Sequence, residues 1–264
     1  MRRTAEATAS YTFLPWGRRR APGPALGVGE PDVPVAIITG ASKGLGRALA
    51  AALAGRGWDL VLDARSAATL RAAAGESRGP GRVVALPWDV TDPGHRTELV
   101  APAAESGGLD PLVNNASALG AEPPARLDAL STEGLRGALE TNVVAPLALT
   151  RAVLPLLRAS GGAVLNVSSD AAVEAYPAWG GYGASKAALE QLSAVLAVEE
   201  PRVRVWWVDP GDMRTDLYAA AVPEDPCAAD RPAPESVVPA LLRQLDECAD
   251  SGRYTAAALL AVRR

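Results

Sequence analysis

The chain has 264 residues, two cysteines and a formal net charge of -4, and these values exclude several classes of protein. A non-specific nucleic-acid binder is normally basic, so the negative balance argues against nucleic acid as a partner. Cys227 and Cys248 have neither a metal-ligand spacing nor a disulfide framework, which predicts a cytoplasmic location. No apolar stretch approaches the roughly 18 residues needed to span a bilayer, so we expect no membrane partner.

Residues 1–33 differ in composition from the rest of the chain. They combine arginines with prolines and glycines, without a helical or strand period. No continuous apolar region follows the basic start, which argues against a signal peptide. An Arg-rich organellar presequence stays open as an alternative, but the composition favours a disordered extension or an over-long start. We therefore place the folded domain at residues 34–264.

From Val35 onward, short apolar runs alternate with helical patterns. The expected strands are residues 35–39, 60–62, 83–86, 112–113, 163–167 and 203–208. Helical patterns lie between them, among them a long one at residues 132–157. Strands that alternate with helices at this spacing indicate βαβ units and a parallel sheet. The sequence thus predicts a single α/β domain with a Rossmann-type, doubly wound parallel sheet, which we expect to have seven strands.

A glycine-rich segment, residues 39–46, lies between the first expected strand and a helix. Its three glycines allow a tight turn, close approach of backbone to a pyrophosphate, and close packing of helix on strand. The start of the helix supplies free N–H groups and a partial positive charge for phosphates. The predicted cofactor contacts in this loop are Gly40, Ser42, Lys43, Gly44, Leu45 and Gly46.

The end of the second expected strand should decide between the two nicotinamide cofactors. An acidic residue there binds the ribose 2′-hydroxyl of NAD, while a basic residue accepts the 2′-phosphate of NADP. Ala64 occupies this place, with Arg65 beside it and Lys43 in the loop. Two cations near one ribose favour NADP, and NAD is the less expected cofactor. A shift of one residue would place Asp63 there and reverse this interpretation.

Tyr182 and Lys186 are four residues apart and share one face of a predicted helix. An ammonium group favours a nearby phenolate, so we expect the lysine to lower the tyrosine pKa from about 10. Such a tyrosine can exchange a proton with a carbonyl oxygen while a hydride moves at carbon. Ser169 ends a predicted strand thirteen residues earlier, and its hydroxyl is suited to hold the substrate oxygen.

Together these motifs resemble those of the short-chain dehydrogenase/reductase family, over residues 34–264. The resemblance includes Asp89 and Val90 for adenine, Asn115 along the cofactor, and residues 210–215 beside the nicotinamide. It implies cofactor contacts from Tyr182, Lys186, Pro210, Gly211, Met213 and Thr215. It also implies a catalytic set of Asn142, Ser169, Tyr182 and Lys186, in which Asn142 helps a water chain reach the lysine.

The resemblance implies an NADP-preferring oxidoreductase that interconverts a carbonyl and an alcohol on a small molecule. Two alternatives stay open: a regulator that senses NADP without turnover, and a redox-neutral cyclase or dehydratase that uses the same tyrosine. We also expect a homodimer or homotetramer, because long helices such as residues 132–157 commonly pair in this family. The C-terminus lacks the family's frequent acidic-Gly-Gly ending, which puts the tetramer contacts in doubt.

Several other residues have no predicted chemical role. His95, the only histidine, follows a predicted turn and has no partner signature, so we expect it at the surface. Trp206 and Trp207 are expected in the core. Asp212 and Arg214 are interpreted as solvated loop residues, with contact to substrate as the alternative. Residues 216–234 have few aromatic side chains and are expected to form a mobile cover over the substrate.

Overall fold

The computed structural model describes residues 33–261, so nearly all of the predicted extension, residues 1–33, lies outside the described residues. Within that range the strands pair in parallel in the order β3-β2-β1-β4-β5-β6-β7. They are β1 (Val35–Ile38), β2 (Asp59–Ala64), β3 (Val83–Pro87), β4 (Pro111–Asn114), β5 (Ala163–Val167), β6 (Arg204–Asp209) and β7 (Gly252–Thr255). The predicted doubly wound sheet of seven parallel strands is confirmed.

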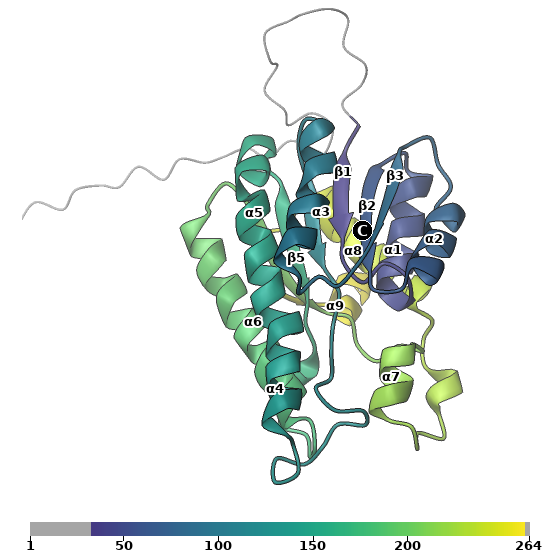
Figure 1. Ribbon diagram of the computed structural model, residues 1–264, viewed down its shortest axis with the longest axis vertical. Helices are drawn as coiled ribbons and strands as arrows, with labels where there is room; N and C mark the ends of the chain where they lie inside the picture. Colours follow the sequence, from purple (N-terminus) through teal and green to yellow (C-terminus); the bar gives the residue numbers. More distant parts are fainter. Residues whose placement is uncertain (1–32, 262–264) are drawn as a thin grey trace, which may run out of the picture.

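Helices cover both faces of this sheet (Figure 1). They are α1 (Gly44–Gly55), α2 (Ala67–Glu76), α3 (Pro93–Glu105), α4 (Thr132–Leu139), α5 (Ala145–Ser160), α6 (Gly180–Glu199), α7 (Asp216–Ala221), α8 (Val238–Glu247) and α9 (Ala256–Ala261). One core cluster joins the sheet to α1 and α8, and a second joins it to α3 and α5. The core therefore consists of two layers with the sheet between them.

The central strand β1 shows why the strands read as continuous apolar runs. Ala36 and Ile38 belong to the cluster beside α1, while Val35 and Ile37 belong to the cluster beside α3. Successive side chains of a strand point to opposite faces, so a strand covered on both faces is apolar at every position. This double burial explains why the short run at residues 35–38 was recognisable as a strand.

The long helix expected at residues 132–157 is interrupted. Between α4 and α5 lies a π-helical segment, η1 (Glu140–Val144), which contains Asn142. A π-helical turn inserts an extra residue into the helix and is frequent at functional sites. The sequence pattern did not indicate this interruption, because the apolar period on either side of η1 is compatible with one helix.

The same stretch corrects the expectation about apolar length. Thr132–Ser160 is long and apolar enough, by length and composition, to cross a membrane. Its apolar residues Leu149, Val153 and Leu157 are fully buried, however, in the core cluster on the α3 side of the sheet. One face of this stretch thus packs in the core of the domain, while Val144 and Leu147 are exposed.

The sheet order defines where a ligand site belongs. The chain goes from β1 to β2 and β3 on one side and returns to β4 on the other, so the order reverses at β1. Ligands of open α/β sheets bind beyond the carboxyl ends of the strands at such a switch point. In Figure 1 this edge points downward, towards α4 and α7.

Candidate active site

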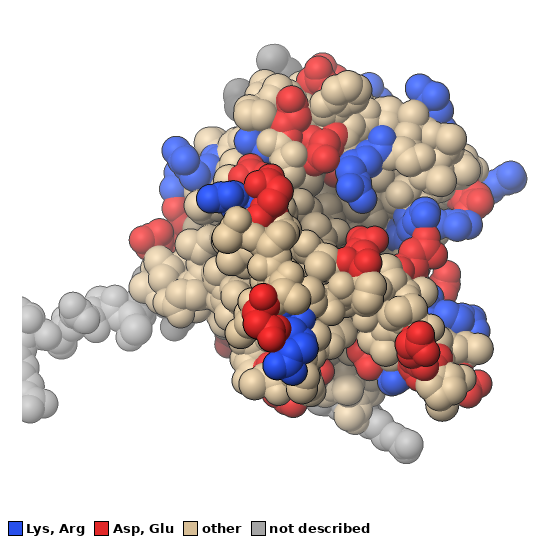
Figure 2. All heavy atoms as spheres, turned by 60° about the horizontal axis from the view of Figure 1, so that its bottom comes forward, with Lys and Arg blue, Asp and Glu red and all other residues tan. Residues whose placement is uncertain are grey.

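A cavity of about 770 Å³ opens at the carboxyl ends of the strands. Its size is in the range of cavities that hold small molecules and cofactors. Figure 2 shows this end of the molecule, where acidic and basic side chains both surround a hollow. The predicted site residues that line the cavity are Gly40, Ser42, Lys43, Gly44, Leu45, Arg65, Asp89, Val90, Asn115, Ser169, Tyr182, Lys186, Pro210, Gly211, Met213 and Thr215. Gly46 and Asn142, also predicted, do not line it.

The glycine loop is tightly enclosed by its neighbours. A Cβ at Gly46 would lie 2.5 Å from Nδ2 of Asn115 and 2.5 Å from the oxygen of Gly40, so no side chain fits there. Gly40 has a φ of +65°, in the left-handed region that favours glycine. The Asn115 amide donates to the carbonyls of Thr39 at 2.9 Å and Gly40 at 3.1 Å, which ties the loop to the end of β4.

The first turn of α1 has the properties of a phosphate site. Its N-cap residue, Lys43, makes no side-chain capping bond to the helix N–H groups. Those N–H groups, with the positive end of the helix dipole, are suited to bind an anion. Gly44 has a φ of +52° and a Cβ there would lie 3.2 Å from Thr215, so backbone alone occupies this part of the cavity wall. The loop therefore fits the diphosphate of a dinucleotide.

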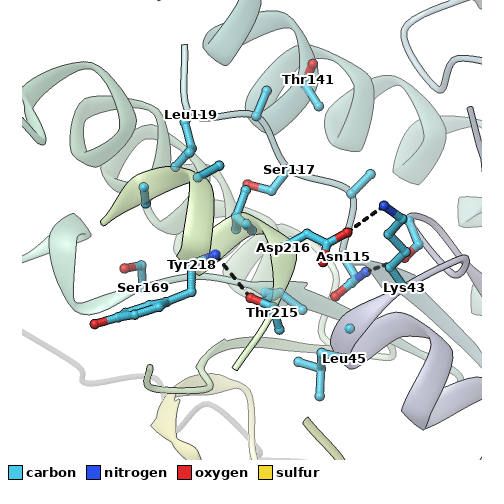
Figure 3. Close-up of a pocket in the computed structure, with 18 of the residues that line it drawn as sticks. Lys43, Leu45, Asn115, Ser117, Leu119, Thr141, Ser169, Thr215, Asp216 and Tyr218 are labelled. Carbon is cyan, nitrogen blue, oxygen red and sulfur yellow. Dashed lines mark hydrogen bonds and ion pairs between the residues drawn. The ribbon is translucent and has the colours of Figure 1, made fainter. Parts of the chain in front are cut away.

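Lys43 also reaches across the mouth of the cavity. Its Nζ lies 2.5 Å from Oδ2 of Asp216, the first residue of α7 (Figure 3). Both side chains are largely exposed, so this ion pair contributes little to stability. It does connect the phosphate loop to the segment predicted as the substrate cover.

At the end of β2 the structure separates the two candidate residues for cofactor choice. Ala64 is the last residue of the strand, and Arg65 lines the cavity next to it. Asp63 also borders the cavity, but its carboxylate is buried and lies 2.7 Å from Nε2 of His95. The expectation that His95 is a surface residue is therefore wrong: it lies in α3, is 3% exposed and pairs with an acid of β2.

Tyr182, in the first turn of α6, is buried at the cavity wall. Burial raises its pKa to about 12, while hydrogen bonding with Ser117 and Ser169 acts in the opposite direction. The expectation of a lowered tyrosine pKa is therefore wrong for the protein's own groups. At neutral pH they keep the phenol protonated, which is the form that can donate a proton.

Lys186 lies one helical turn after Tyr182 and is also buried. Its Nζ donates to the carbonyl of Val167 at 2.8 Å and lies 5.5 Å from the centroid of the Tyr182 ring. Burial lowers the pKa of Lys186 to about 8. A buried lysine that shares a cavity with a buried phenol and a serine is an arrangement suited to proton transfer.

Ser169 follows β5 and lines the cavity beside an acid that the sequence reasoning did not select. Its Oγ donates to Oδ1 of Asp170 at 3.0 Å and accepts the N–H of Ala171 at 3.2 Å. Asp170 also accepts the hydroxyl of Tyr176 at 3.0 Å. Asp170, Tyr176 and Trp179 all line the cavity, and their position between Ser169 and Tyr182 in the sequence was the available signal for them.

Asn142 is buried behind the cavity and uses its whole amide group. Its Oδ1 accepts the N–H of Ala118 at 2.8 Å and the Ser117 hydroxyl at 3.2 Å. Its Nδ2 donates to the Ala118 carbonyl and to Oγ of Ser185, each at 2.8 Å. An amide has no further donor or acceptor position. Any link from Asn142 to a water chain therefore has to use its main-chain carbonyl.

The segment after β6 forms one wall of the cavity, to which residues as far as Val222 contribute. Thr215 caps α7 by accepting the N–H of Tyr218 at 3.2 Å (Figure 3). Tyr218 lines the cavity and donates to Asp225 at 2.6 Å. Asp212 lines the cavity and pairs with Arg231 at 3.1 Å, whereas Arg214 is not among the lining residues described.

The two tryptophans of β6 lie away from this cavity, as far as the described residues show. Trp206 is fully buried, as expected, and its Nε1 donates to the carbonyl of Ala249 at 3.0 Å. Trp207 is partly buried and packs against the cluster on the α3 side. The expected core position is thus confirmed for Trp206 and correct in part for Trp207.

A parallel sheet with a phosphate-binding loop at its switch point and a buried tyrosine–lysine pair defines a dinucleotide-dependent α/β oxidoreductase. The short chain dehydrogenase model matches residues 34–226, and the chain belongs to the short-chain dehydrogenase/reductase family.

Curated relatives support this assignment over about three quarters of the chain. An uncharacterized oxidoreductase of Mycobacterium tuberculosis is 35% identical over 199 residues, which cover 74% of each protein. L-fucose dehydrogenase of Rattus norvegicus is 35% identical and covers 76% of this chain and 74% of its own length. Sepiapterin reductase of Rattus norvegicus is 37% identical, with 71% of this chain and 77% of that protein covered.

Solved structures agree with the fold and carry both nicotinamide cofactors. An alcohol dehydrogenase of Thermococcus sibiricus with 5-hydroxy-NADP has a TM-score of 0.76 at 30% identity, covering 84% of this chain and 95% of that one. A 3-ketoacyl-(acyl-carrier-protein) reductase of Brucella melitensis with NADH has the same TM-score at 25% identity and the same coverage.

Proposed function

We propose that this oxidoreductase interconverts a carbonyl and an alcohol on a small organic molecule, with Tyr182 as general acid and base and NADP as the preferred cofactor. The observation that carries the proposal is the meeting of Ser169, Tyr182 and Lys186 in the wall of one cavity. The relatives that act on a sugar and on a pterin support small-molecule chemistry of this kind.

Each residue of this set has a physical role in the proposed reaction. Tyr182 donates its phenolic proton to the oxygen of a carbonyl substrate, or accepts one from an alcohol. The hydroxyl of Ser169 holds the same oxygen beside the phenol. When Tyr182 has lost its proton, the Lys186 ammonium stabilises the phenolate. A bound nicotinamide supplies or accepts the hydride at the substrate carbon.

The preference for NADP rests on charge at the end of β2. Arg65 follows Ala64 and lines the cavity, so a 2′-phosphate there meets a cation. Lys43 adds a second positive charge at the loop, although Asp216 shares it. The solved structure with 5-hydroxy-NADP supports the proposal, whereas the one with NADH keeps the alternative cofactor open to measurement.

We further propose a homodimer formed through α5 and α6. These helices lie side by side, since a small gap between them is lined by residues of both. The exposed apolar residues here are Leu147 of α5, Val195 and Val198 of α6, and Val144 at the end of η1. An exposed apolar patch across two neighbouring helices is typical of a protein–protein interface.

The cytoplasmic location stays a prediction.

The test of the reaction is Tyr182→Phe, which keeps the ring and its packing but removes the hydroxyl. A panel of carbonyl compounds is screened with wild-type protein by the loss of NADPH absorbance. For a substrate so found, turnover of the variant should fall by at least about 100-fold, the usual contribution of a general acid. NADPH affinity should change little, because the hydroxyl faces Ser117 and Ser169 rather than the phosphate loop.

Tyr254→Phe is the matched control, because its hydroxyl donates to Asp250 and Tyr254 is not among the described cavity residues. Its turnover should stay near that of the wild type. Full activity of Tyr182→Phe would contradict the mechanism. If NADPH bound but no carbonyl or alcohol were converted, the regulator or the redox-neutral enzyme would become the better interpretation.

A further inference from the structure

The alternation of side chains along β2 places Asp63 and Ala64 over different helices. Val61 belongs to the core cluster that contains residues of α3, whereas Leu62 and Ala64 belong to the cluster that contains residues of α1. Since the period of a strand is two, Asp63 lies on the α3 side with Val61. The only acidic side chain at this end of β2 is thereby aligned with the start of α3.

His95 occupies that start of α3 and holds the acid in place. Its main-chain N–H is bound by Oδ1 of the N-cap residue Asp92 at 2.8 Å, which fixes the residue in the first turn. Its ring Nε2 lies 2.7 Å from Oδ1 of Asp63, and both side chains are only 2% exposed. The N–H of Gly40 also binds the Asp63 carboxylate. The carboxylate is therefore engaged by the ring of His95 and by the main chain of the phosphate loop.

The charges around this pair favour retention of a proton on it. Burial would lower the pKa of His95, but Asp63 and the more distant Glu98 outweigh that effect and raise it. Burial raises the pKa of Asp63 despite its bond to His95, and Asp89 acts in the same direction. With a proton on the pair, Asp63 brings no net negative charge to the cavity wall beside Arg65.

We propose that His95 is a positioning residue for cofactor choice, which holds Asp63 away from the ribose and leaves Arg65 to meet a 2′-phosphate. The proposal rests on the proposed binding of NADP. A free carboxylate at this place would repel a 2′-phosphate and would accept a hydrogen bond from a 2′-hydroxyl. The histidine therefore allows a strand whose penultimate residue is an acid to select the phosphorylated cofactor.

The test measures dissociation constants of NADPH and NADH for the full chain and its variants. His95→Leu removes the partner of a buried carboxylate, which then turns towards the water of the cavity, because an unpaired buried charge is strongly disfavoured. The ratio Kd(NADH)/Kd(NADPH) should fall by about tenfold or more, mainly through weaker NADPH binding, since like charges at close range repel.

Three variants separate positioning from a general effect on the fold. Asp63→Asn combined with His95→Leu should return the ratio to within about threefold of the wild type, because the repelling charge is gone. His95→Gln keeps a donor towards Asp63 and should also keep the ratio. Asp63→Asn alone should leave it unchanged, and this variant remains informative even if His95→Leu does not fold.

Each result decides for or against the role of His95. A ratio that stays constant in folded His95→Leu, or that the double variant does not restore, would overturn the proposal. So would a selective loss of NADH affinity in Asp63→Asn alone, since Asp63 would then already bind the ribose. The wild-type ratio tests the proposed function separately: a preference for NADH would refute NADP selectivity, whereas a shift on losing His95 would still support the positioning role.

Discussion

Lys186 offers the sharpest test of the electrostatics of the site, because its charge is unfavourable for the fold. Its ammonium is buried, and burial lowers its pKa from the ordinary value of 10.5 to about 8. Since one pKa unit corresponds to about 1.4 kcal/mol, the folded protein pays about 3 kcal/mol to keep this lysine charged. Lys186→Met retains the apolar stem and removes the charge.

The expected gain in stability is smaller than that figure. The variant also loses the hydrogen bond from Nζ to the Val167 carbonyl, and such a loss costs about 1 to 2 kcal/mol. We therefore expect the free energy of unfolding of Lys186→Met to be about 1 to 2 kcal/mol higher than that of the wild type at pH 7. Turnover should be abolished, because no ammonium remains beside Tyr182.

The pH dependence of the stability difference between Lys186→Met and wild type distinguishes an effect of charge from a purely structural effect. Because the folded pKa is below the unfolded one, the unfolded chain binds more protons between pH 8 and 10.5, and wild-type stability rises across that window. The advantage of Lys186→Met should therefore be complete below pH 8 and shrink by pH 10. Urea unfolding of both proteins at pH 7 and pH 10 measures it.

Lys43→Met is the matched control, because Lys43 is the only other lysine in the sequence and its side chain is 59% exposed. It should show little change in stability, because its ion pair with Asp216 is exposed. The reasoning would be refuted if Lys186→Met were less stable than wild type at pH 7 by the same amount as at pH 10.

Two further predictions concern the cofactor and the assembly. Arg65→Ala should weaken NADPH binding about tenfold or more and leave NADH binding nearly unchanged, because it removes a charge-assisted contact to the 2′-phosphate. Fluorescence titration measures both affinities, and an equal loss for the two cofactors would contradict this prediction. Light scattering at micromolar concentration should show a dimer. Val198, in α6, is 82% exposed, and Val198→Glu should shift the protein towards the monomer. A monomeric wild-type protein would contradict the proposed dimer.

The fold was predictable because it depends on local patterns. The strands β1 and β5 are apolar at nearly every position and are buried on both faces, which a sequence displays directly. β7 was not located, because its sequence Gly-Arg-Tyr-Thr has no apolar run and none of its residues is fully buried. It is held at the edge of the sheet by main-chain pairing with β6, which does not depend on side-chain type.

The errors in the prediction of the site came from contacts and burial that depend on distant elements of the fold. Asp63 and His95 are 32 positions apart, on a strand and a helix, and no local signal indicates that their side chains meet. The pKa of Tyr182 was expected to follow the charge of Lys186, but burial of the phenol has the larger effect. Both outcomes depend on desolvation, which a sequence does not report for single atoms.

Two buried asparagines outside α6 hold the helix that carries the catalytic pair. Asn142 and Asn166 donate to Ser185 and Ser193 of α6, each at 2.8 Å, and all four residues are buried. The two serines are eight residues apart, so they lie on the same face of the helix, two turns from one another. Two such bonds along one face restrain the rotation of α6 about its axis, because turning the helix would break both of these buried hydrogen bonds. The orientation of Tyr182 and Lys186 towards the cavity is therefore supported from behind, by residues of η1 and β5.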